Sequence, residues 1–330
     1  MRVVVLGGGR SSEHPVSLMS AASVLEGLQR AGHEAVSVVI GRDGLWREDE
    51  GSEPLSLTPG GGLLAADVVF PVLHGPFGED GTVQGLLETA DVPYVGAGVL
   101  GSAVCMDKAV FKGLMANAGM PQVRYELVTQ RDWSDAEDAT LERLGGLGLP
   151  VFVKPSRLGS SVGISKASSP DALAPAVEAA LAHDPRVLVE AAADGIEVEC
   201  SVIGNDEPLV SEPGQVIARG DWYDYESKYT EGGMELVVPA PISPAQRERV
   251  RRIAQDAFLW SCCSGLARVD FFVTARGQVL LNELNTIPGF TATSVFSRLF
   301  EASGVGYEEL LSRLLDFAVE RHEHERAHSY

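Results

Sequence analysis

Short apolar runs separated by amphipathic stretches set the pattern of the first hundred residues. The runs at 3–6, 35–40 and 68–73 are almost wholly apolar, which is typical of strands that are buried on both faces. Polar and apolar positions over about 17–30 follow the period of an amphipathic helix, and Gly32 ends it. This order of strand, loop, helix and strand predicts an α/β domain with a parallel sheet.

The rest of the chain alternates strand and helix patterns less regularly. Further strands are predicted at 92–95, 150–155, 187–190 and 197–203, and helices at about 106–117, 171–182 and 244–260. Residues 96–101 are expected to form a hinge-like link. We predict three units with bounds of 1–103, 104–189 and 190–330.

A β-hairpin is predicted in the last unit, where two apolar, β-prone runs flank Arg276-Gly277. A glycine at this place suits a tight two-residue turn. With that tip, Asp270 faces Glu283 and Arg268 faces Asn285. Side chains alternate along a strand, so all four lie on one face of the hairpin.

Two carboxylates that face each other repel, so this face of the hairpin needs a cation. Carboxylate and amide oxygens without a thiolate or an imidazole favour a hard ion, Mg²⁺ or Mn²⁺. The alternative is a solvated outer face. It is disfavoured because Phe272 and Leu281 are expected to share the face with the charged residues. The hairpin is therefore predicted to form one wall of a metal-dependent site.

A nucleotide site is indicated by lysines and small residues in the middle of the chain. Lys154 ends an apolar strand and leads into 156–163, whose many Gly and Ser N–H groups suit a flap over phosphates. Lys108 stands in a first helical turn, where the dipole disfavours a cation, so we expect it to point at an anion. Glu190 and Glu197 bracket a short connection and suit an adenine amine or ribose hydroxyls, with solvated strand-end carboxylates as the alternative.

Composition and charge exclude several classes of protein. The 330 residues are 45% hydrophobic and 22% charged, which is ordinary for a globular protein. A formal net charge of −20 argues against non-specific binding to nucleic acid. No apolar run is long enough to span a membrane, and Met1 leads directly into a strand, so no signal peptide is expected. The four cysteines lack zinc-ligand spacing and predict reduced thiols in a cytoplasmic protein.

Two polar residues stand in loops at the carboxyl edge of the N-terminal sheet, where open sheets bind ligands. Glu13 lies in the first loop between strand and helix, and its carboxylate suits an ammonium group. An acid at a helix N-terminus is the alternative. His74 leads into a loop with four glycines in the eleven residues 75–85, so it is expected to face a ligand.

Two more loops carry groups that suit a closed site. Residues 219–235 are rich in aromatic side chains but lack periodicity, which indicates an ordered loop that closes on a ligand. Lys228 and Tyr229 are its best polar candidates. The turn at 287–290 contains proline and glycine, and its backbone N–H groups suit an oxyanion.

Taken together, these motifs resemble the D-alanine–D-alanine ligases of the ATP-grasp superfamily. The resemblance covers nearly the whole chain and is carried by the segments 7–17, 74–85, 107–108, 153–163, 223–229, 268–270 and 283–291. It implies an α/β (α+β) ATP-grasp fold with three parts. These are an N-terminal Rossmann-like parallel-sheet domain, a central lid domain and a C-terminal domain that carries the Mg²⁺ site.

The resemblance implies that ATP activates one D-alanine as D-alanyl phosphate, which a second D-alanine then attacks to give a dipeptide for peptidoglycan synthesis. The implied ATP ligands are Lys108, Lys154, Ser160, Ser161, Glu190, Glu197, Lys228 and Asn285. The implied ligands of two Mg²⁺ ions, which Mn²⁺ is able to replace, are Asp270, Glu283 and Asn285.

The resemblance also implies roles around the amino acids. Glu13 binds the first ammonium group with His74 nearby, and Arg268 and the Gly289 N–H stabilise the tetrahedral oxyanion. The implied contacts to the second D-alanine are Lys228, Ser294 and Val295. The implied trio that closes the lid consists of Glu13, Ser160 and Tyr229. A homodimer is the habit of the family.

Three residues depart from the family pattern. Leu158 stands where an acid is common, Val295 where leucine or methionine is usual, and Ser297 where proline is usual. A smaller side chain at Val295 raises the alternative of a bulkier second substrate such as D-serine. Tyr229 favours the dipeptide over D-alanyl-D-lactate, because ligases that make the latter often carry histidine there.

Two rivals come from other classes. Gly7–Gly9 suit a nicotinamide-dependent oxidoreductase, but Ser12 replaces the third glycine of the fingerprint and the hairpin acids stay unexplained. A catalytically silent nucleotide-binding protein is disfavoured by Lys154, Arg268 and the predicted metal ligands.

Overall fold

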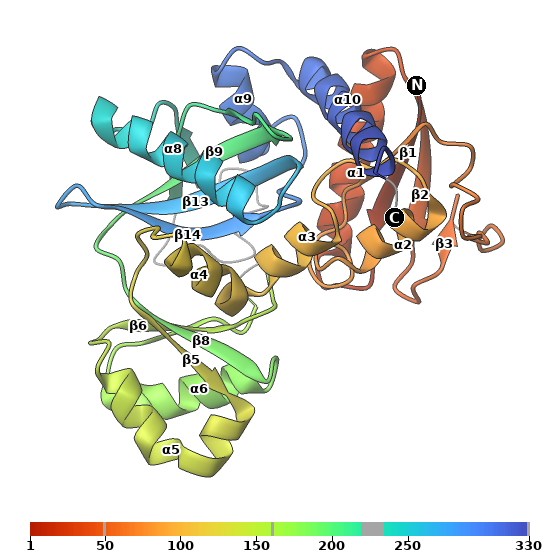
Figure 1. The fold of residues 1–330 in the computed structure, drawn as a ribbon. Coiled ribbons are helices and arrows are strands. Elements are labelled where there is room, and N and C mark those ends of the chain that lie inside the picture. The colour runs from red at the N-terminus through yellow and green to blue at the C-terminus, as the bar shows by residue number, and fades with distance from the viewer. Residues whose placement is uncertain (49–50, 160–161, 219–233, 329–330) are drawn as a thin grey trace.

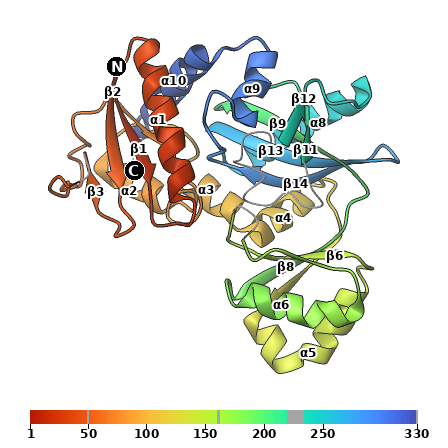
Figure 2. The same cartoon turned by 180° about the vertical axis from the view of Figure 1, so that it is seen from behind.

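The computed structural model describes residues 1–48, 51–159, 162–218 and 234–328. Strands of this part of the chain form three sheets, and helices cover them (Figures 1 and 2). The predicted α/β class is confirmed. No helix among the described residues has both the length and the apolar surface that crossing a bilayer requires.

The first sheet has the order β3-β2-β1-β4. Its strands are β1 (Arg2–Gly8), β2 (Glu34–Ile40), β3 (Trp46–Arg47) and β4 (Val68–Pro71). β1 pairs in parallel with β2 and β4, as the apolar runs predict, and Val3 to Leu6 are fully buried. Helix α1 (His14–Arg30) packs on β1 and β2, and α2 (Thr82–Ala90) follows the loop that begins at His74.

Two predictions for residues 92–106 are wrong. The expected strand at 92–95 forms one isolated bridge between Val69 and Tyr94, because Pro93 has no N–H to continue the ladder. The expected link at 96–101 runs into helix α3 (Val99–Met106). A β-carbon at Gly101 would lie 2.7 Å from the Cys262 carbonyl oxygen. Gly101 therefore serves close packing rather than a hinge.

The second sheet has the order β5-β8-β6-β7 and forms the lobe at the bottom of Figure 1. Its strands are β5 (Tyr125–Thr129), β6 (Val151–Pro155), β7 (Ser165–Ala167) and β8 (Arg186–Ala191). All three pairings are antiparallel. The helices of this lobe are α5 (Gln130–Gly145), the short η1 (Pro170–Ala172) and α6 (Leu173–Leu181). They bury Val128, Val151, Val153 and Val177 in a common core.

The third sheet has the order β12-β11-β9-β13-β14, with β10 paired to β9. Its strands are β9 (Gly195–Gly204), β10 (Leu209–Val210), β11 (Gly214–Ala218), β12 (Met234–Val237), β13 (Gly265–Thr274) and β14 (Val279–Asn285). The helices near it are α4 (Lys108–Asn117), α8 (Pro244–Trp260), α9 (Val295–Ala302) and α10 (Tyr307–Arg326). α4 lies between β14 and the second sheet in Figure 1. Its Phe111 and Met115 pack in the core of the third sheet with Phe258 and Leu281.

The hairpin of β13 and β14 is present, but the predicted two-residue tip is wrong. The Thr274 N–H donates to the Gln278 carbonyl at 2.9 Å, and the Gly277 N–H donates to the Thr274 carbonyl at 2.8 Å. These bonds close a three-residue loop at 275–277. Gly277 has a φ of +83°, the left-handed conformation that such loops require at their last position.

A bulge at Asn282 shifts the pairing back by one residue. Asp270 therefore faces Glu283, and Arg268 faces Asn285, as predicted. The prediction of these two pairs was right because two shifts of the register cancel. The loop is one residue longer than predicted, and the bulge adds one residue to β14.

The expectation that Phe272 and Leu281 share a face is wrong. On the tip side of the bulge, Phe272 pairs with Leu280, and Leu281 pairs with Phe271 on the opposite face. Leu281 is fully buried in the core of the third sheet. The bulge thus places Leu281 on the face opposite to the charged side chains of Asp270 and Glu283.

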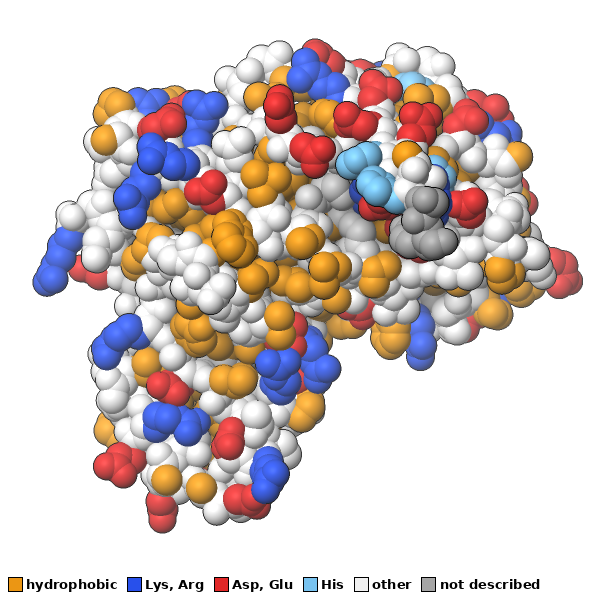
Figure 3. Space-filling view, viewed as in Figure 1, with side chains coloured by type: hydrophobic (Ala, Val, Ile, Leu, Met, Phe, Trp, Pro, Cys, Tyr) orange, Lys and Arg blue, Asp and Glu red, His pale blue; other side chains and the backbone are white. Residues whose placement is uncertain are grey.

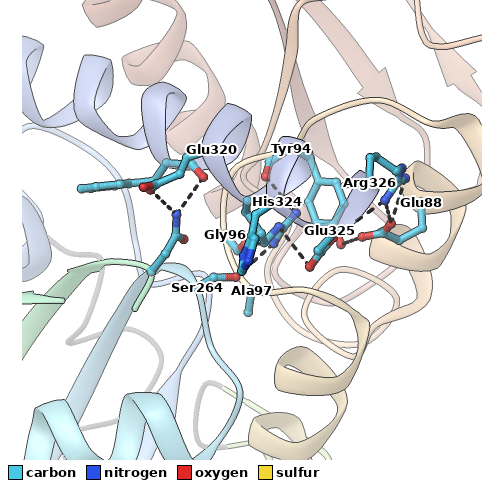
Figure 4. A network of polar contacts seen from close by, with 12 residues as sticks. Glu88, Tyr94, Gly96, Ala97, Ser264, Glu320, His324, Glu325 and Arg326 are labelled. Atoms are coloured by element: carbon cyan, nitrogen blue, oxygen red, sulfur yellow. Dashed lines mark hydrogen bonds and ion pairs between the residues drawn. The ribbon is translucent and has the colours of Figure 1, made fainter. Parts of the chain in front are cut away.

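Helix α10 joins the first sheet to the third. The buried Arg321 guanidinium donates to the Gly96 and Tyr94 carbonyl oxygens and to Ser264 Oγ, the last two at 3.2 Å, and lies 4.1 Å from the centre of the Tyr94 ring. Figure 4 shows Tyr94, Gly96 and Ser264 gathered around the last turns of α10. Arg326 adds an exposed ion pair to Glu88.

Hydrophobic side chains gather across the centre of the face in Figure 3, where Figure 1 shows α3, α4 and α8. The exposed large hydrophobic side chains of these three helices are Val99, Leu100, Val110, Leu259 and Trp260.

We expect Arg321→Met to lower the free energy of unfolding by about 3 kcal/mol, because three buried acceptors lose a charged donor. Urea-induced unfolding followed by circular dichroism measures the change. Arg313→Met on the same helix is the matched control, since its exposed ion pair with Glu309 is worth less than about 1 kcal/mol. An equal loss of unfolding free energy in both variants would contradict the conclusion that Arg321 helps to join the first sheet to the third.

Candidate active site

A cavity of about 350 Å³ lies between the second and third sheets, and loops of the first sheet line one end of it. The structure brings most of the predicted site residues together here. Those that line it are Glu13, His74, Lys108, Lys154, Glu190, Glu197, Arg268, Asp270, Glu283, Asn285 and Gly289.

The other predicted site residues fall into two groups. Ser160, Ser161, Lys228 and Tyr229 are outside the described residues. Ser294 and Val295 are not among the residues that line the cavity.

One end of the cavity is built around the carboxylate of Glu190 on β8. Lys112 Nζ lies 2.6 Å from Glu190 Oε1, and Lys154 Nζ contacts Glu190 Oε2. Burial opposes the ionisation of Glu190, but the two lysines outweigh it and lower the pKa of Glu190 to about 2. Burial likewise opposes the charge of Lys154, but Glu190 and Glu283 outweigh it and raise the pKa of Lys154. Glu190 and Lys154 are therefore both charged at neutral pH.

Lys108 is held at the start of α4 by a well-capped helix end. The Asp107 carboxylate accepts hydrogen bonds from the N–H groups of Ala109 and Val110, each at 3.1 Å, and Ser156 Oγ donates to it at 2.7 Å. Lys108 Nζ donates to the Leu158 carbonyl at 2.8 Å and lies 3.8 Å from Glu283 Oε2. The first turn of α4 thus ties the flap to the hairpin.

At the end of the cavity formed by the β13–β14 hairpin, a guanidinium group contacts carboxylates. Arg268 makes two hydrogen bonds to the Asp270 carboxylate, at 2.8 and 2.7 Å, and its Nε lies 3.0 Å from Glu199 Oε2. Asn285 Nδ2 donates to Asp270 Oδ2 at 3.1 Å. Asp270 faces both Glu199 and Glu283 on the neighbouring strands. Asp270 and Glu199 therefore contact one guanidinium, and Glu283 faces Asp270 from the next strand.

The oxygens of Asp270, Glu283 and Asn285 fit a hard divalent cation. The first two face each other across the hairpin, and a half-turn of the Asn285 amide would point its oxygen toward Asp270. Within the described ranges, no three His, Cys, Asp or Glu side chains form a ready metal cluster. The two carboxylates and the amide would have to be completed by oxygens of a bound substrate.

Glu13 lies at the other end of the cavity and is 5% exposed. It stands at the N-cap of α1, but its side chain makes no capping hydrogen bond. A β-carbon at Gly75 would lie 2.7 Å from Glu13 Oε2, and one at Gly159 would lie 3.2 Å from it. Gly75 and Gly159 therefore make room for this carboxylate. The missing capping hydrogen bond favours the ligand-binding interpretation over a helix-capping role.

His74 and Glu79 both contact the backbone of Ile287. His74 Nδ1 lies 3.0 Å from the Ile287 carbonyl oxygen, and its Nε2 lies 3.2 Å from Ser20 Oγ. Glu79 accepts hydrogen bonds from the N–H groups of Gly75 at 2.6 Å and Ile287 at 3.3 Å. Both polar groups of Ile287 are thus held by the loop that follows β4.

Burial shifts the pKa values of these two side chains in opposite directions. Burial lowers the pKa of His74 and outweighs the nearby Glu13, so its imidazole is neutral. Burial and the repulsion of Glu13 raise the pKa of Glu79 to about 8. Glu79 is therefore largely protonated at pH 7.

Ser294 is the N-cap residue of α9, and its Oγ accepts a hydrogen bond from the Thr291 N–H at 3.0 Å. It lies next to Gly289, where a β-carbon would be 3.5 Å from Ser294 Oγ. Val295 packs in a small apolar cluster with Val216, Leu236 and Leu299.

Sequence reasoning gave no role to three residues that the structure places in or next to the site, namely Lys112, Glu79 and Glu199. Lys112 stands four residues after Lys108, so helical spacing puts both on one side of α4. Glu199 stands two residues after Glu197 on β9, so strand alternation puts both side chains on one face. Glu79 belongs to the glycine-rich loop at 75–85, but no local sequence pattern predicts that its side chain is buried.

Comparisons with known proteins cover nearly the whole chain. The family model described as D-ala D-ala ligase N-terminus matches residues 2–61 and 48–97. The model described as D-ala D-ala ligase C-terminus matches residues 114–316.

Relatives agree with these models. The chain is 48% identical to the D-alanine–D-alanine ligase of Deinococcus radiodurans over 334 residues, with 97% of this chain and 98% of that protein covered. It is 39% identical to D-alanine–D-alanine ligase A of Escherichia coli K12, with 98% and 96% covered.

Solved structures agree as well. The D-alanine–D-alanine ligase from Coxiella burnetii superposes with a TM-score of 0.89 at 35% identity, covering 99% of this chain and 96% of that chain. VanG D-Ala:D-Ser ligase from Enterococcus faecalis gives a TM-score of 0.86 at 33% identity, covering 96% and 99%. The chain belongs to the D-alanine–D-alanine ligase family, whose members have the ATP-grasp fold.

Proposed function

We propose that the chain joins two D-alanine molecules to D-alanyl-D-alanine at the expense of ATP, for the synthesis of peptidoglycan precursors. The observation that carries the proposal is the composition of the cavity. Lys108 and Lys154, an oxygen-rich hairpin and the buried carboxylate of Glu13 lie together in it. Family membership supports the reaction class, a ligase that forms a carbon–nitrogen bond.

ATP lies between the second and third sheets in this proposal. Lys108 and Lys154 bind phosphate oxygens, and Glu190 and Glu197 accept hydrogen bonds from the adenine amine or the ribose. Two Mg²⁺ ions held by Asp270, Glu283 and Asn285 would neutralise charge on the transferred phosphoryl group.

In the first step, a carboxylate oxygen of the first D-alanine attacks the γ-phosphorus of ATP. The bond between that phosphorus and the β-phosphate oxygen breaks, and ADP and D-alanyl phosphate form. Glu13 binds the ammonium group of the first D-alanine at its end of the cavity. The water-excluded position of the cavity protects the acyl phosphate from hydrolysis.

In the second step, the deprotonated amine of the second D-alanine attacks the carbonyl carbon of D-alanyl phosphate. Arg268 and the Gly289 N–H stabilise the negative oxygen of the tetrahedral intermediate. The carbon–oxygen bond to phosphate then breaks, and the dipeptide forms. Glu79 and His74 support this step, because they hold Ile287 two residues before Gly289.

Several finer predictions rest on the family resemblance alone. They are the trio of Glu13, Ser160 and Tyr229, the phosphate contacts of Ser161 and Lys228, the homodimer and the cytoplasmic location. The division at 103 and 189 also stays a prediction, and its second boundary falls inside β8.

We expect the purified protein to release ADP from ATP only when D-alanine is added, and the product mass to be that of D-alanyl-D-alanine. A coupled ADP assay with mass spectrometry across D-alanine, D-serine, D-lactate and L-alanine measures both. Product formed only with D-serine or D-lactate would move the chain to a specialised ligase. No ADP release with any of them would refute the ligase proposal.

We expect Asp270→Asn and Glu283→Gln each to slow ADP release by a factor on the order of a hundred or more, because each removes charge from the oxygen set. A chelator should abolish the activity of the unaltered enzyme, and excess Mg²⁺ or Mn²⁺ should restore it. Asp256→Asn, at an exposed position of α8, is the matched control. Full activity after chelation would contradict the metal assignment.

The raised pKa of Glu79 predicts a pH-dependent stability. Between pH 4.5, its ordinary value, and about pH 8, the unfolded chain loses the Glu79 proton while the folded chain keeps it. Stability from this residue therefore falls as pH rises through that window, and the loss is complete above about pH 8.

Glu79→Gln does not ionise, so its melting temperature relative to the unaltered protein should rise steadily from pH 5 to pH 8. Thermal unfolding at four pH values measures the difference. Glu178→Gln, at an exposed position on α6, serves as the comparison variant. A Glu79→Gln difference that stays constant with pH would contradict the raised pKa.

A further inference from the structure

Helix α4 carries two lysines one turn apart. Lys108 lines the cavity, whereas Lys112 does not line it and is 2% exposed. An ammonium group removed from water to this extent needs a partner, because an unpaired buried charge is strongly unfavourable. The partner of Lys112 shows what the residue does.

Lys112 contacts the same carboxylate as Lys154, but from another element. Its Nζ lies 2.6 Å from Glu190 Oε1 and 5.6 Å from the centre of the Tyr125 ring. Lys154, on β6, contacts the second oxygen of Glu190. Glu190 is itself 2% exposed and sits on β8 between Tyr125 of β5 and Phe152 of β6.

This arrangement decides how much positive charge the cavity presents. Lys154 and Glu190 alone form a neutral pair, whereas the trio with Lys112 carries one net positive charge. Two more carboxylates, Glu197 and Glu283, also act on Lys154. A polyphosphate that enters beside these acids needs a compensating positive charge, since charges interact strongly away from water.

We propose that Lys112 is a positioning residue of the phosphate site, which neutralises Glu190 from outside the cavity so that Glu190 does not cancel the positive charge that Lys154 presents to the nucleotide phosphates. The proposal rests on the proposed use of ATP. It assigns to Lys112 an electrostatic role that acts through Glu190 and Lys154, without contact between Lys112 and the nucleotide.

A purely structural role makes a different prediction. If Lys112 only fastens α4 to the second sheet, removing Glu190 as well should add a second defect. If its charge is what matters, removing Glu190 as well should restore the net positive charge that the loss of Lys112 took away. The double variant Lys112→Met/Glu190→Gln therefore separates the two roles, because glutamine removes the negative charge of Glu190 but keeps an oxygen that accepts the hydrogen bond proposed from the nucleotide.

The experiment measures the dissociation constant of ADP with Mg²⁺ by isothermal titration calorimetry, and KM for ATP and for D-alanine in ADP release. We expect Lys112→Met to weaken ADP binding and raise KM for ATP by about tenfold, the equivalent of about 1.4 kcal/mol, with little change in KM for D-alanine. Lys112→Arg should retain most of the affinity. The double variant should bind ADP more tightly than Lys112→Met.

Lys166→Met is the matched control, because Lys166 is an exposed lysine on β7 that lies over the Phe152 ring and does not contact Glu190. Unchanged ADP binding by Lys112→Met would overturn the proposal. A double variant that binds ADP no better than Lys112→Met would overturn it as well. If the unaltered protein binds ADP but shows no D-alanine-dependent turnover, the ligase function fails while the binding series still tests Lys112.

Discussion

The carboxylate of Glu190 contacts two ammonium groups that come from different elements, Lys112 on α4 and Lys154 on β6. Each of the three groups is nearly removed from water, so none is stable there without the others. This contact fastens α4 to the second sheet, while other side chains of α4 pack in the core of the third. The relative position of the two sheets, and therefore the width of the cavity, depends on one helix that is attached to both.

The two walls of the cavity are electrostatically complementary. The second sheet and the start of α4 contribute lysines, and the third sheet contributes the acids around Arg268. Lys108 reaches across the gap to within 3.8 Å of Glu283. Such an arrangement is ready to accept a ligand that carries both a polyphosphate and metal ions, because each wall already holds charges of the sign opposite to one part of it. The first sheet adds the buried Glu13 and, through His74 and Glu79, holds the turn that contains Gly289.

Local pattern was sufficient for the elements whose residues pair or pack with near neighbours. The apolar runs of the first sheet and the helix over 244–260 were predicted within a few residues, because their periodicity reports burial directly. Pairing of Asp270 with Glu283 was predicted through a tip that does not exist. The three-residue loop and the bulge at Asn282 each shift the register by one residue, in opposite directions. Counting residues along the sequence gives only the sum of the two shifts, which is zero. The face of Leu281 depends on where the bulge lies, so that prediction failed.

By itself, the sequence determined which chemistry was available to this protein: few lysines, paired acids on a hairpin, and glycine-rich loops after strands. These follow from residue type and spacing, and they were enough for the family. The tertiary structure alone decided which charges share a partner. Lys112 and Glu190 are 78 positions apart in the chain, and only the packing of α4 against the second sheet brings them to 2.6 Å. The same holds for Glu79, whose carboxyl group is kept protonated by burial and by Glu13, 66 positions away in the chain. Charge pairing and desolvation depend on distance in space, which spacing along the sequence does not encode.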